Sequence, residues 1–404
     1  MSGPFRHVGL ESMSLVPAVL MAGVTAYGIW ETRRHERHLL KIPIRIHVNG
    51  TRGKSSVTRL IAAGLRAGGI RTFAKTTGTT ARMIDADGSE IDVFRVGKPN
   101  IIEQTRIVRR AVEDRAEAIV LECMAVTPEL QPVSELRLVR STIGVITNVR
   151  ADHLDVMGPT VDDVARALGQ AIPIRGHLFT AERARIDFLA TEARRRGTEL
   201  HALPRETVTE SDLQGFTYYE HAENLALALA VCAHLGVDRS VALEGMKRAT
   251  PDPGVLRRYW VHVGSKKVEF VNAFAANDPD STRLIWTRLG LDRAEPGVRR
   301  IVLANCRADR LQRSGQIAQL VARDIAADHV VLSGQGTALV AMRAVSQGLG
   351  RARLSDLGGL NAEQIFQRVM NLIPERGIVV GIGNIVGLGQ EIVLHFKNQA
   401  VRRG

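Results

Sequence analysis

The sequence has few cysteines and few aromatic residues. Three cysteines, Cys123, Cys232 and Cys306, are scattered without paired spacing, which excludes a disulfide scaffold and a four-cysteine zinc site. Such sparse cysteine is typical of a reducing compartment. Aromatic residues make up 4% of the chain, without a stacking array, so nucleic-acid binding is not expected. Low-complexity tracts are also missing, which excludes wholesale disorder.

Acidic residues are outnumbered by basic ones. The chain has 54 Lys and Arg against 42 Asp and Glu, a formal net charge of +12. A surplus of this size favours an anionic partner, which could be a nucleotide, a nucleic acid, an acidic lipid or an acidic polymer. Composition alone does not choose among them. The length of 404 residues predicts two or three domains.

An uncharged run, Ser12–Trp30, lies near the N-terminus and is followed by Arg33, Arg34, Arg37 and Lys41. As a helix it would span roughly 28 Å, close to the thickness of a hydrocarbon core. Because the positive charge follows the run, we expect a single-pass anchor in the cell membrane with the bulk of the chain in the cytoplasm. The alternatives are a cleaved signal peptide, whose charge would come first, and a buried core helix.

Beyond Lys41, short apolar runs alternate with helical periodicity, which predicts an α/β fold with a parallel sheet covered on both faces. The predicted strands are Ile42–Val48, Ala116–Val126, Ser141–Val149, Val268–Phe274, Arg299–Arg307, Asp328–Gly334 and Arg376–Gly383. The predicted helices are Ser55–Gly68, Thr160–Ala171 and Glu220–Leu235. The turn Pro251–Gly254 indicates a domain boundary. We therefore expect an anchor at 1–40, a first domain at 41–250 and a smaller α/β domain at 251–404.

The segment Gly381–Gly389, GIGNIVGLG, superficially resembles a dinucleotide-binding turn. It follows the last predicted strand, and no acidic residue stands at the required distance on a further strand. We interpret it as a structural loop.

The strongest motif is VNGTRGKSS, Val48–Ser56, between a predicted strand and a predicted helix. Glycines let backbone N–H groups turn around an anion, and the helix N-terminus adds partial positive charge. Lys54 would reach the β- and γ-phosphates, and the Ser55 hydroxyl would ligate Mg²⁺. The alternative is a glycine-rich turn with a chance Lys-Ser pair. The predicted nucleotide-binding residues of this loop are Gly50, Thr51, Arg52, Gly53, Lys54, Ser55 and Ser56.

Two further segments place acidic and imidazole groups after apolar strands. Glu122 lies inside a strand, where a carboxylate is costly unless it is paired or binds metal; the alternative is a salt-bridged strand end. The segment Thr147–Gly158 gathers Asp152, His153 and Asp155 at a strand's carboxyl end, where open α/β sheets bind ligands. Glu122 and His153 are therefore candidate metal ligands.

A third segment, KTTGTTAR (Lys75–Arg82), is rich in hydroxyl groups and ends in a cation. It predicts a second loop facing the γ-phosphate, with Thr79 as a candidate metal ligand. Lys75 and Arg82 are candidate substrate contacts. The alternative is an ordinary polar turn.

Taken together, these segments resemble the Mur ligase superfamily and, within it, the catalytic subunits of capsular poly-γ-glutamate synthases. The resemblance runs from about residue 13 to the C-terminus. It implies a P-loop ATPase domain with a parallel sheet and a smaller Rossmann-like C-terminal domain. The implied cofactors are ATP and Mg²⁺, and the implied reaction is ATP-dependent amide ligation through an acyl phosphate. The matching segments are NGTRGKSSVTRL, KTTGTTARMI, ECMAV, DHLDVMGPT, PDPG, FAANDPDST and NCRADR.

The resemblance also implies roles for single residues. Lys54, Glu122 and His153 match catalytic or metal-binding positions. Asn224 matches the residue associated with adenine, and Arg257 matches an arginine that reaches phosphate or ribose. The implied substrate contacts in the C-terminal part are Asn277, Asp278, Arg307 and Arg310. For the C-terminal arginines, the alternative is ordinary surface charge.

The sequence departs from the family pattern at two positions. Many Mur ligases hold a second Mg²⁺ through a carbamoylated lysine, but here no lysine occurs between Lys98 and Lys247, and Gln170 stands near the expected place. The family's DYAHNP aspartate aligns with Ala273, so we expect the ribose contact from elsewhere, such as Asn272. Because only the predicted anchor precedes the ATPase domain, a UDP-linked substrate is not expected.

The leading hypothesis is a ligase that adds glutamate to a growing poly-γ-glutamate chain and releases ADP and phosphate. One alternative is a Mur-like ligase that joins another amino acid to a folate or a peptide tail. Another is a nucleotide-gated membrane binding protein without turnover. The resemblance further implies an integral-membrane partner subunit and an accessory protein, and a homo-oligomer is left open.

Overall fold

The chain divides into two compact units. The first comprises the residues up to Thr77, Ala81–Thr209 and Ala222–Ala249, and the second comprises Glu210–His221 and the residues from Thr250 onward. The computed structural model describes residues 10–77, 81–95, 99–204, 207–216, 218, 220–251, 256–274, 279–308 and 311–400.

The first unit is built on an eight-stranded sheet in the order β4-β3-β2-β5-β1-β6-β7-β8. Its strands are β1 (Ile44–Asn49), β2 (Thr72–Lys75), β3 (Arg82–Ile84), β4 (Glu90–Asp92), β5 (Ala118–Glu122), β6 (Ile143–Ile146), β7 (His177–Thr180) and β8 (Glu199–Ala202). The six strands from β2 to β8 in this order are parallel to one another, whereas β3 pairs in antiparallel fashion with both β2 and β4. Parallel strands covered on both faces are continuously apolar, as β6 is and as β5 is up to its last residue, Glu122.

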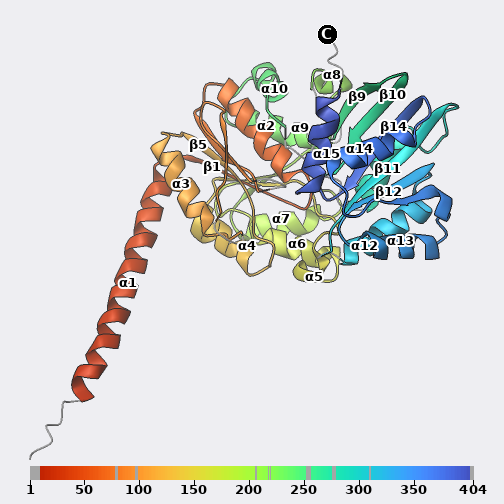
Figure 1. Cartoon of the computed structure of the whole chain (residues 1–404). Coiled ribbons are helices and arrows are strands. Elements are labelled where there is room, and N and C mark those ends of the chain that lie inside the picture. The colour runs from red at the N-terminus through yellow and green to blue at the C-terminus, as the bar shows by residue number, and fades with distance from the viewer. Residues whose placement is uncertain are drawn as a thin grey trace, which may run out of the picture. The chain divides into compact units, whose positions relative to one another are not determined.

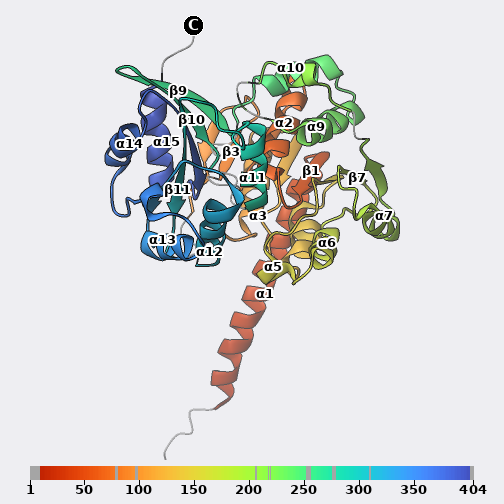
Figure 2. The same ribbon diagram turned by 90° about the vertical axis from the view of Figure 1, so that its right-hand side faces the viewer.

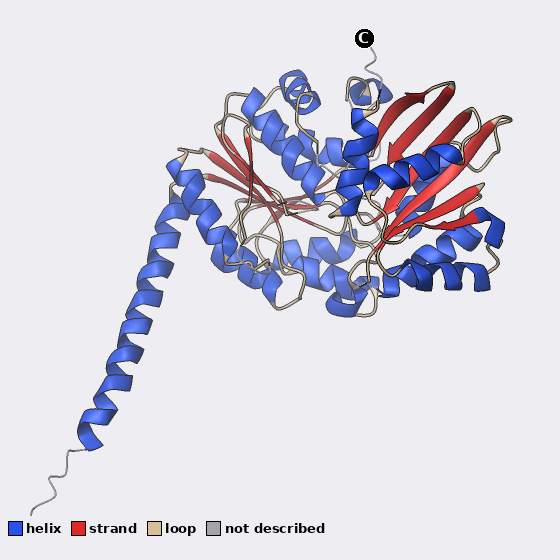
Figure 3. Ribbon diagram, in the orientation of Figure 1, coloured by secondary structure: helices blue, strands red, loops and turns tan. Residues whose placement is uncertain are grey.

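Helices cover both faces of this sheet (Figures 1 and 3). One face carries α2 (Lys54–Ala67), α9 (Ala222–His234) and α10 (Arg239–Lys247), which pack against one another. The helices of the other face are α3 (Glu103–Glu113), α4 (Leu130–Val133), the π-helix η1 (Ser134–Val139), α5 (Leu154–Met157), α6 (Val161–Gly169) and α7 (Ile186–Arg195). The α/β class predicted from the sequence is therefore confirmed.

The run Ser12–Trp30 forms the first part of helix α1 (Leu10–Leu40), and its side chains from Val16 to Trp30 are exposed. The last turns of α1 pack on the first unit, where Leu39 is buried and His35 Nε2 lies 2.9 Å from the Leu138 carbonyl.

Among the residues that the structure describes, no helix is both long and apolar enough to cross a membrane. The predicted single-pass anchor, and with it the predicted location in the cell membrane, is therefore wrong. Glycine, threonine and proline dilute the apolar side chains of α1, and charged residues flank the run at Glu11 and from Glu31 onward. The prediction relied on the lack of charged residues in Ser12–Trp30, but an uncharged run is not necessarily apolar enough to span a membrane.

The second unit has a six-stranded sheet in the order β13-β12-β11-β14-β10-β9. The strands are β9 (Arg257–Val263), β10 (Lys266–Asn272), β11 (Val298–Cys306), β12 (His329–Gly334), β13 (Leu354–Asp356) and β14 (Arg376–Gly383). Only β9 is antiparallel to its neighbour. The helices are α8 (Glu210–Leu213), α11 (Pro279–Arg288), α12 (Leu311–Gln319), the π-helix η2 (Leu320–Asp324), α13 (Thr337–Ser346), the 3₁₀-helix η3 (Arg351–Arg353), α14 (Ala362–Asn371) and α15 (Leu388–Asn398).

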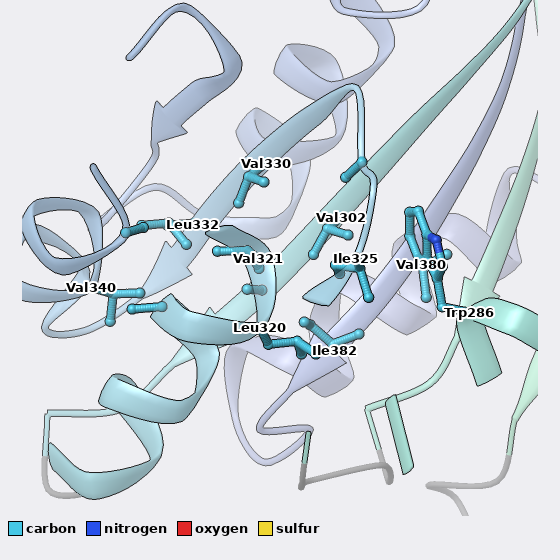
Figure 4. Packing of buried hydrophobic residues seen from close by; sticks show 14 of the residues in the cluster. Trp286, Val302, Leu320, Val321, Ile325, Val330, Leu332, Val340, Val380 and Ile382 are labelled. Atoms are coloured by element: carbon cyan, nitrogen blue, oxygen red, sulfur yellow. The ribbon is translucent and has the colours of Figure 1, made fainter. Parts of the chain in front are cut away.

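Successive side chains of the strands in the second unit enter two separate cores. Val302, Val330 and Val380 pack with Trp286 and with the helices on one face, as Figure 4 shows. Their chain neighbours, such as Leu303, belong to a second cluster with α14 and α15. This period of two is what a sheet buried on both faces requires.

Candidate active site

The predicted phosphate loop joins the central strand β1 to the N-terminus of α2. Gly50 and Gly53 adopt positive φ angles of +125° and +83°. A Cβ on Gly50 would lie 2.1 Å from Thr147 Oγ1, so this position accepts only glycine. Strand, glycine turn and helix N-terminus therefore occur in the order that phosphate binding needs.

Lys54, the first residue of α2, folds back over the loop. Its Nζ donates to the Gly50 carbonyl at 2.7 Å and contacts the Thr51 carbonyl at 3.4 Å. The ammonium group is thus held at the turn that would receive an anion.

Asn148, which follows β6, forms hydrogen bonds to the loop, although the sequence motifs predicted no role for it. Its Oδ1 accepts hydrogen bonds from Thr51 Oγ1 at 2.6 Å and from the Arg52 N–H at 3.1 Å. Its Nδ2 donates to the Arg52 carbonyl at 3.1 Å. The signal in the sequence was its place after a strand adjacent to β1, within the same segment Thr147–Gly158 that contains DHLD.

Glu122 ends β5 opposite Val48 of β1, and its side chain is 3% exposed. Its Oε2 accepts hydrogen bonds from Ser55 Oγ at 2.9 Å and from the Thr77 N–H at 2.6 Å. The buried carboxylate and the Ser55 hydroxyl thus lie side by side next to the loop. Oxygen donors of this kind suit Mg²⁺, so the residues fit the implied ion.

His153 precedes α5 with a left-handed φ of +49°, and its side chain is 43% exposed. Its Nε2 lies 4.0 Å from Asp152 Oδ1, and the same carboxylate oxygen lies 3.5 Å from Arg52 Nη2. The DHLD segment is therefore tied to the phosphate loop through Arg52 and Asp152. The metal role of His153 stays a prediction.

Asn224 lies on α9 and is buried against the phosphate loop. A Cβ on Gly53 would approach Asn224 Oδ1 to 2.4 Å. The structure therefore brings Asn224 to the loop, and its adenine role stays a prediction.

Lys75, a candidate substrate contact, is fully buried at the end of β2. Its Nζ lies 2.8 Å from Glu103 Oε1, and Arg95 Nε lies 2.6 Å from Oε2 of the same carboxylate. Burial lowers the pKa of Lys75, although Glu103 opposes the shift. Arg82 Nη1 pairs with Asp92 Oδ1 at 3.0 Å. The substrate roles of Lys75 and Arg82 stay predictions, and Thr79 lies outside the described residues.

The remaining candidates belong to the second unit. Arg257 begins β9, and Arg307 follows β11 at the carboxyl edge of the sheet. Asn272 ends β10, is buried, and accepts a hydrogen bond from the Phe274 N–H at 3.3 Å. Asn277, Asp278 and Arg310 lie outside the described residues.

Gln170, which stands near the expected carbamoylated lysine, follows α6 in the first unit. Its Oε1 accepts a contact from Arg196 Nη2 at 3.4 Å. The amide therefore has a structural partner at this position.

His47 is a buried polar residue on β1, the strand that leads into the phosphate loop. His47 Nδ1 on β1 lies 2.8 Å from Glu135 Oε2. Burial opposes a charged imidazole, but Cys123 and Glu135 outweigh it and raise the pKa of His47 to about 10. Burial likewise opposes ionisation of Cys123, but His47 lowers the pKa of that thiol.

Two family models match the chain. Residues 259–399 match the poly-gamma-glutamate synthase CapB C-terminal domain, and residues 48–208 match the Mur ligase middle domain. The capsule biosynthesis protein CapB of Bacillus anthracis is 39% identical over 387 residues, which are 95% of this chain and 83% of the relative. The PGA synthase CapB of Bacillus subtilis (strain 168) is 38% identical over 391 residues, with 95% and 98% covered.

Solved structures share the fold at lower identity. The bifunctional folylpolyglutamate synthase/dihydrofolate synthase of Yersinia pestis, complexed with AMPPNP and a Mn ion, matches with a TM-score of 0.68. It is 16% identical, with 90% of this chain and 92% of that chain covered. The folylpolyglutamate synthase of Mycobacterium tuberculosis, complexed with ADP, has a TM-score of 0.66, 17% identity, and coverage of 92% and 94%.

Proposed function

This chain belongs to the CapB family of poly-γ-glutamate synthases, and on that premise we propose that it ligates glutamate to a growing poly-γ-glutamate chain. It is an ATP-dependent amide ligase that activates a terminal carboxylate as an acyl phosphate and releases ADP and phosphate. The observation that carries the proposal is the contact of the Ser55 hydroxyl with the Glu122 carboxylate beside the phosphate loop. The curated relatives do not favour the alternative ligase for folate or a peptide tail.

The reaction brings two anions together, so the protein must collect positive charge where they meet. Bound ATP with Mg²⁺ supplies the phosphoryl group. The loop N–H groups and the Lys54 ammonium would hold phosphate oxygens, and Ser55 and Glu122 would hold the metal ion. The hydrogen bonds of Asn148 to Thr51 and Arg52 hold the loop in this shape.

We assign further roles on the family likeness alone. His153 and Thr79 join the metal site, Asn224 contacts adenine, and Arg257 contacts phosphate or ribose. The proposed substrate contacts are Lys75, Arg82, Asn277, Asp278, Arg307 and Arg310. The proposed domain boundaries are 41–250 and 251–404, and the proposed partners are an integral-membrane subunit and an accessory protein.

The test is a turnover assay with the purified chain, together with the partner subunits where they are needed. Glutamate, Mg²⁺ and ATP should yield polymer and ADP. AMP and pyrophosphate as products would contradict acyl-phosphate chemistry. A panel of other amino acids, folate and peptide acceptors tests the alternative, since only glutamate should release ADP.

Two variants link the assay to the site. Lys54→Ala should lower ADP release at least about 100-fold while the chain stays folded, because the loop loses its cation. Glu122→Gln should raise the Mg²⁺ concentration needed for half-maximal rate, since an amide is a weaker ligand. Circular dichroism checks folding in both cases. Wild-type turnover in either variant would remove that residue from the site.

A further inference from the structure

Three histidines converge at the edge of the first unit, away from the residues assigned above. His177 begins β7, His201 lies in β8 and His234 ends α9. One ligand atom from each lies within 4.8 Å of the others. His177 Nδ1 and His201 Nε2 are 3.1 Å apart, and the rings of His177 and His234 are centred 4.2 Å apart.

The register of the sheet explains why these side chains meet. His177 pairs with Glu199, so His201 lies two residues along β8 on the same face. Helix α9 packs on β7 (Figure 2). His234, the last residue of this helix, thereby meets His177 and His201. Phe179 stacks on the His201 ring at 4.4 Å with an interplanar angle of 11°, which restricts rotation of the imidazole.

Glu199 adds a carboxylate to the cluster. Its Oε2 lies 3.3 Å from His177 Nδ1, and its Oε1 lies 3.7 Å from His201 Nε2. The Glu199 side chain is 65% exposed, so an ion could enter from solvent. Three imidazoles and one carboxylate are a complete donor set for a four-coordinate metal.

The cluster is separate from the phosphate loop. The loop follows the carboxyl end of β1, whereas His177 and Glu199 are the first residues of β7 and β8. Strands β1, β6, β7 and β8 run parallel, so these ends lie on opposite edges of the sheet. The donor types differ as well, since imidazole suits Zn²⁺, Ni²⁺ or Cu²⁺ and oxygen suits Mg²⁺.

We propose that His177, His201 and His234, with Glu199 as fourth ligand, bind one divalent transition-metal ion of the zinc type. The ion fastens α9, which carries Asn224, to the β7–β8 edge of the sheet. Zn–N bonds of about 2.0–2.1 Å in a tetrahedron place nitrogens about 3.3 Å apart. Side-chain rotations that move the ligand atoms by roughly an ångström therefore complete the site.

The test is a Co²⁺ titration of the untagged, metal-stripped chain in saturating Mg²⁺, followed by competition with Zn²⁺. We expect one Co²⁺ per chain with the visible absorption of a tetrahedral N/O site, and displacement by Zn²⁺. His201→Ala and His234→Ala should each weaken binding about 100-fold or more, a larger loss than outer-shell changes cause. Zn²⁺ should also raise the unfolding temperature of the wild type.

The control is His262→Ala, which removes an exposed histidine on β9 of the second unit and should leave Co²⁺ affinity unchanged. Glu199→Gln tests the fourth ligand at an exposed position where folding is not at risk. Circular dichroism of the metal-free variants excludes unfolding as the cause of lost binding. Wild-type affinity in His201→Ala and His234→Ala, or the absence of a saturable Co²⁺ signal, would overturn the proposal.

Discussion

At the scale of single residues, the phosphate loop depends on backbone shape as much as on its lysine. Gly53 and Gly69 have nearly equal φ angles of +83° and +84°. Only Gly53 is crowded, because its Cβ would meet Asn224 Oδ1, whereas a Cβ on Gly69 would meet nothing within 4 Å. A comparison of substitutions at Gly53 and Gly69 therefore distinguishes the effect of backbone strain from the effect of the contact with Asn224.

We predict that Gly53→Ala weakens ADP binding at least about tenfold, the equivalent of ~1.4 kcal/mol, because the new methyl group displaces Asn224 from the loop. Isothermal titration calorimetry measures the affinity. Gly69→Ala is the control: both variants should lose about 1–2 kcal/mol of stability to left-handed strain, but Gly69→Ala should bind ADP normally. Equal affinities in the two variants would refute the contact's role.

His47 gives a second prediction at this scale, since its folded pKa of about 10 lies above its ordinary value of 6.5. A raised pKa means that the protonated imidazole stabilises the fold. This contribution is fully present below about pH 6.5 and is lost as the pH rises through 10. His47→Gln should therefore destabilise the chain most at low pH, and the difference should shrink toward pH 10.

Urea unfolding of wild type and His47→Gln across this pH range makes the measurement. His262→Gln, at an exposed site on β9 of the second unit, is the control for the exchange of histidine for glutamine. A His47→Gln effect that grows with pH would mean that the buried imidazole is neutral in the folded chain.

At the scale of elements, helix α14 shows how local sequence fixes a boundary. Asn361 Oδ1 accepts the Gln364 N–H at 2.9 Å, and Gln364 Oε1 accepts the Asn361 N–H at 3.2 Å. This capping box starts a helix whose Ile365, Phe366 and Val369 enter the core. The cap therefore fixes the residue at which the helix begins.

We predict that Asn361→Ala lowers the free energy of unfolding by about 1 kcal/mol, because N–H groups at the helix start lose their acceptor. Chemical denaturation measures it. Asn371→Ala, at the exposed last position of the same helix, is the matched control and should cause no loss, since alanine favours helix. If Asn371→Ala is as costly as Asn361→Ala, the capping explanation fails.

At the scale of the whole molecule, each unit has its own sheet and its own cores. Trp286 is fully buried in the second unit, and Phe73 is fully buried in the first. Neither cluster draws residues from the other unit. Damage to one core should therefore be felt first in the unit that contains it.

We predict two unfolding transitions in scanning calorimetry. Trp286→Ala should lower the free energy of unfolding of the second unit by about 3–5 kcal/mol, because it leaves a large cavity. Phe73→Ala should have the same effect on the first unit. Nucleotide with Mg²⁺ should raise the transition that Phe73→Ala lowers. A single transition displaced equally by both variants would show that the units unfold together.

The sequence by itself determined the elements that local patterning dictates. Apolar runs predicted β1, β5, β6, β10, β11, β12 and β14 with ends that differ by a few residues, and the glycine-lysine motif placed the phosphate loop. The family could be inferred because motif residues lie close together along the chain. Strands such as β3 and β4 were missed because three residues carry too little periodicity.

Only the tertiary structure decided which distant residues meet. Asn148 reaches Thr51 across 97 residues of chain, and Lys75 finds Glu103 rather than open solvent. The three histidines come together because strand register and helix packing place them on one face. Such contacts depend on the three-dimensional path of the backbone, which spacing along a sequence does not encode residue by residue.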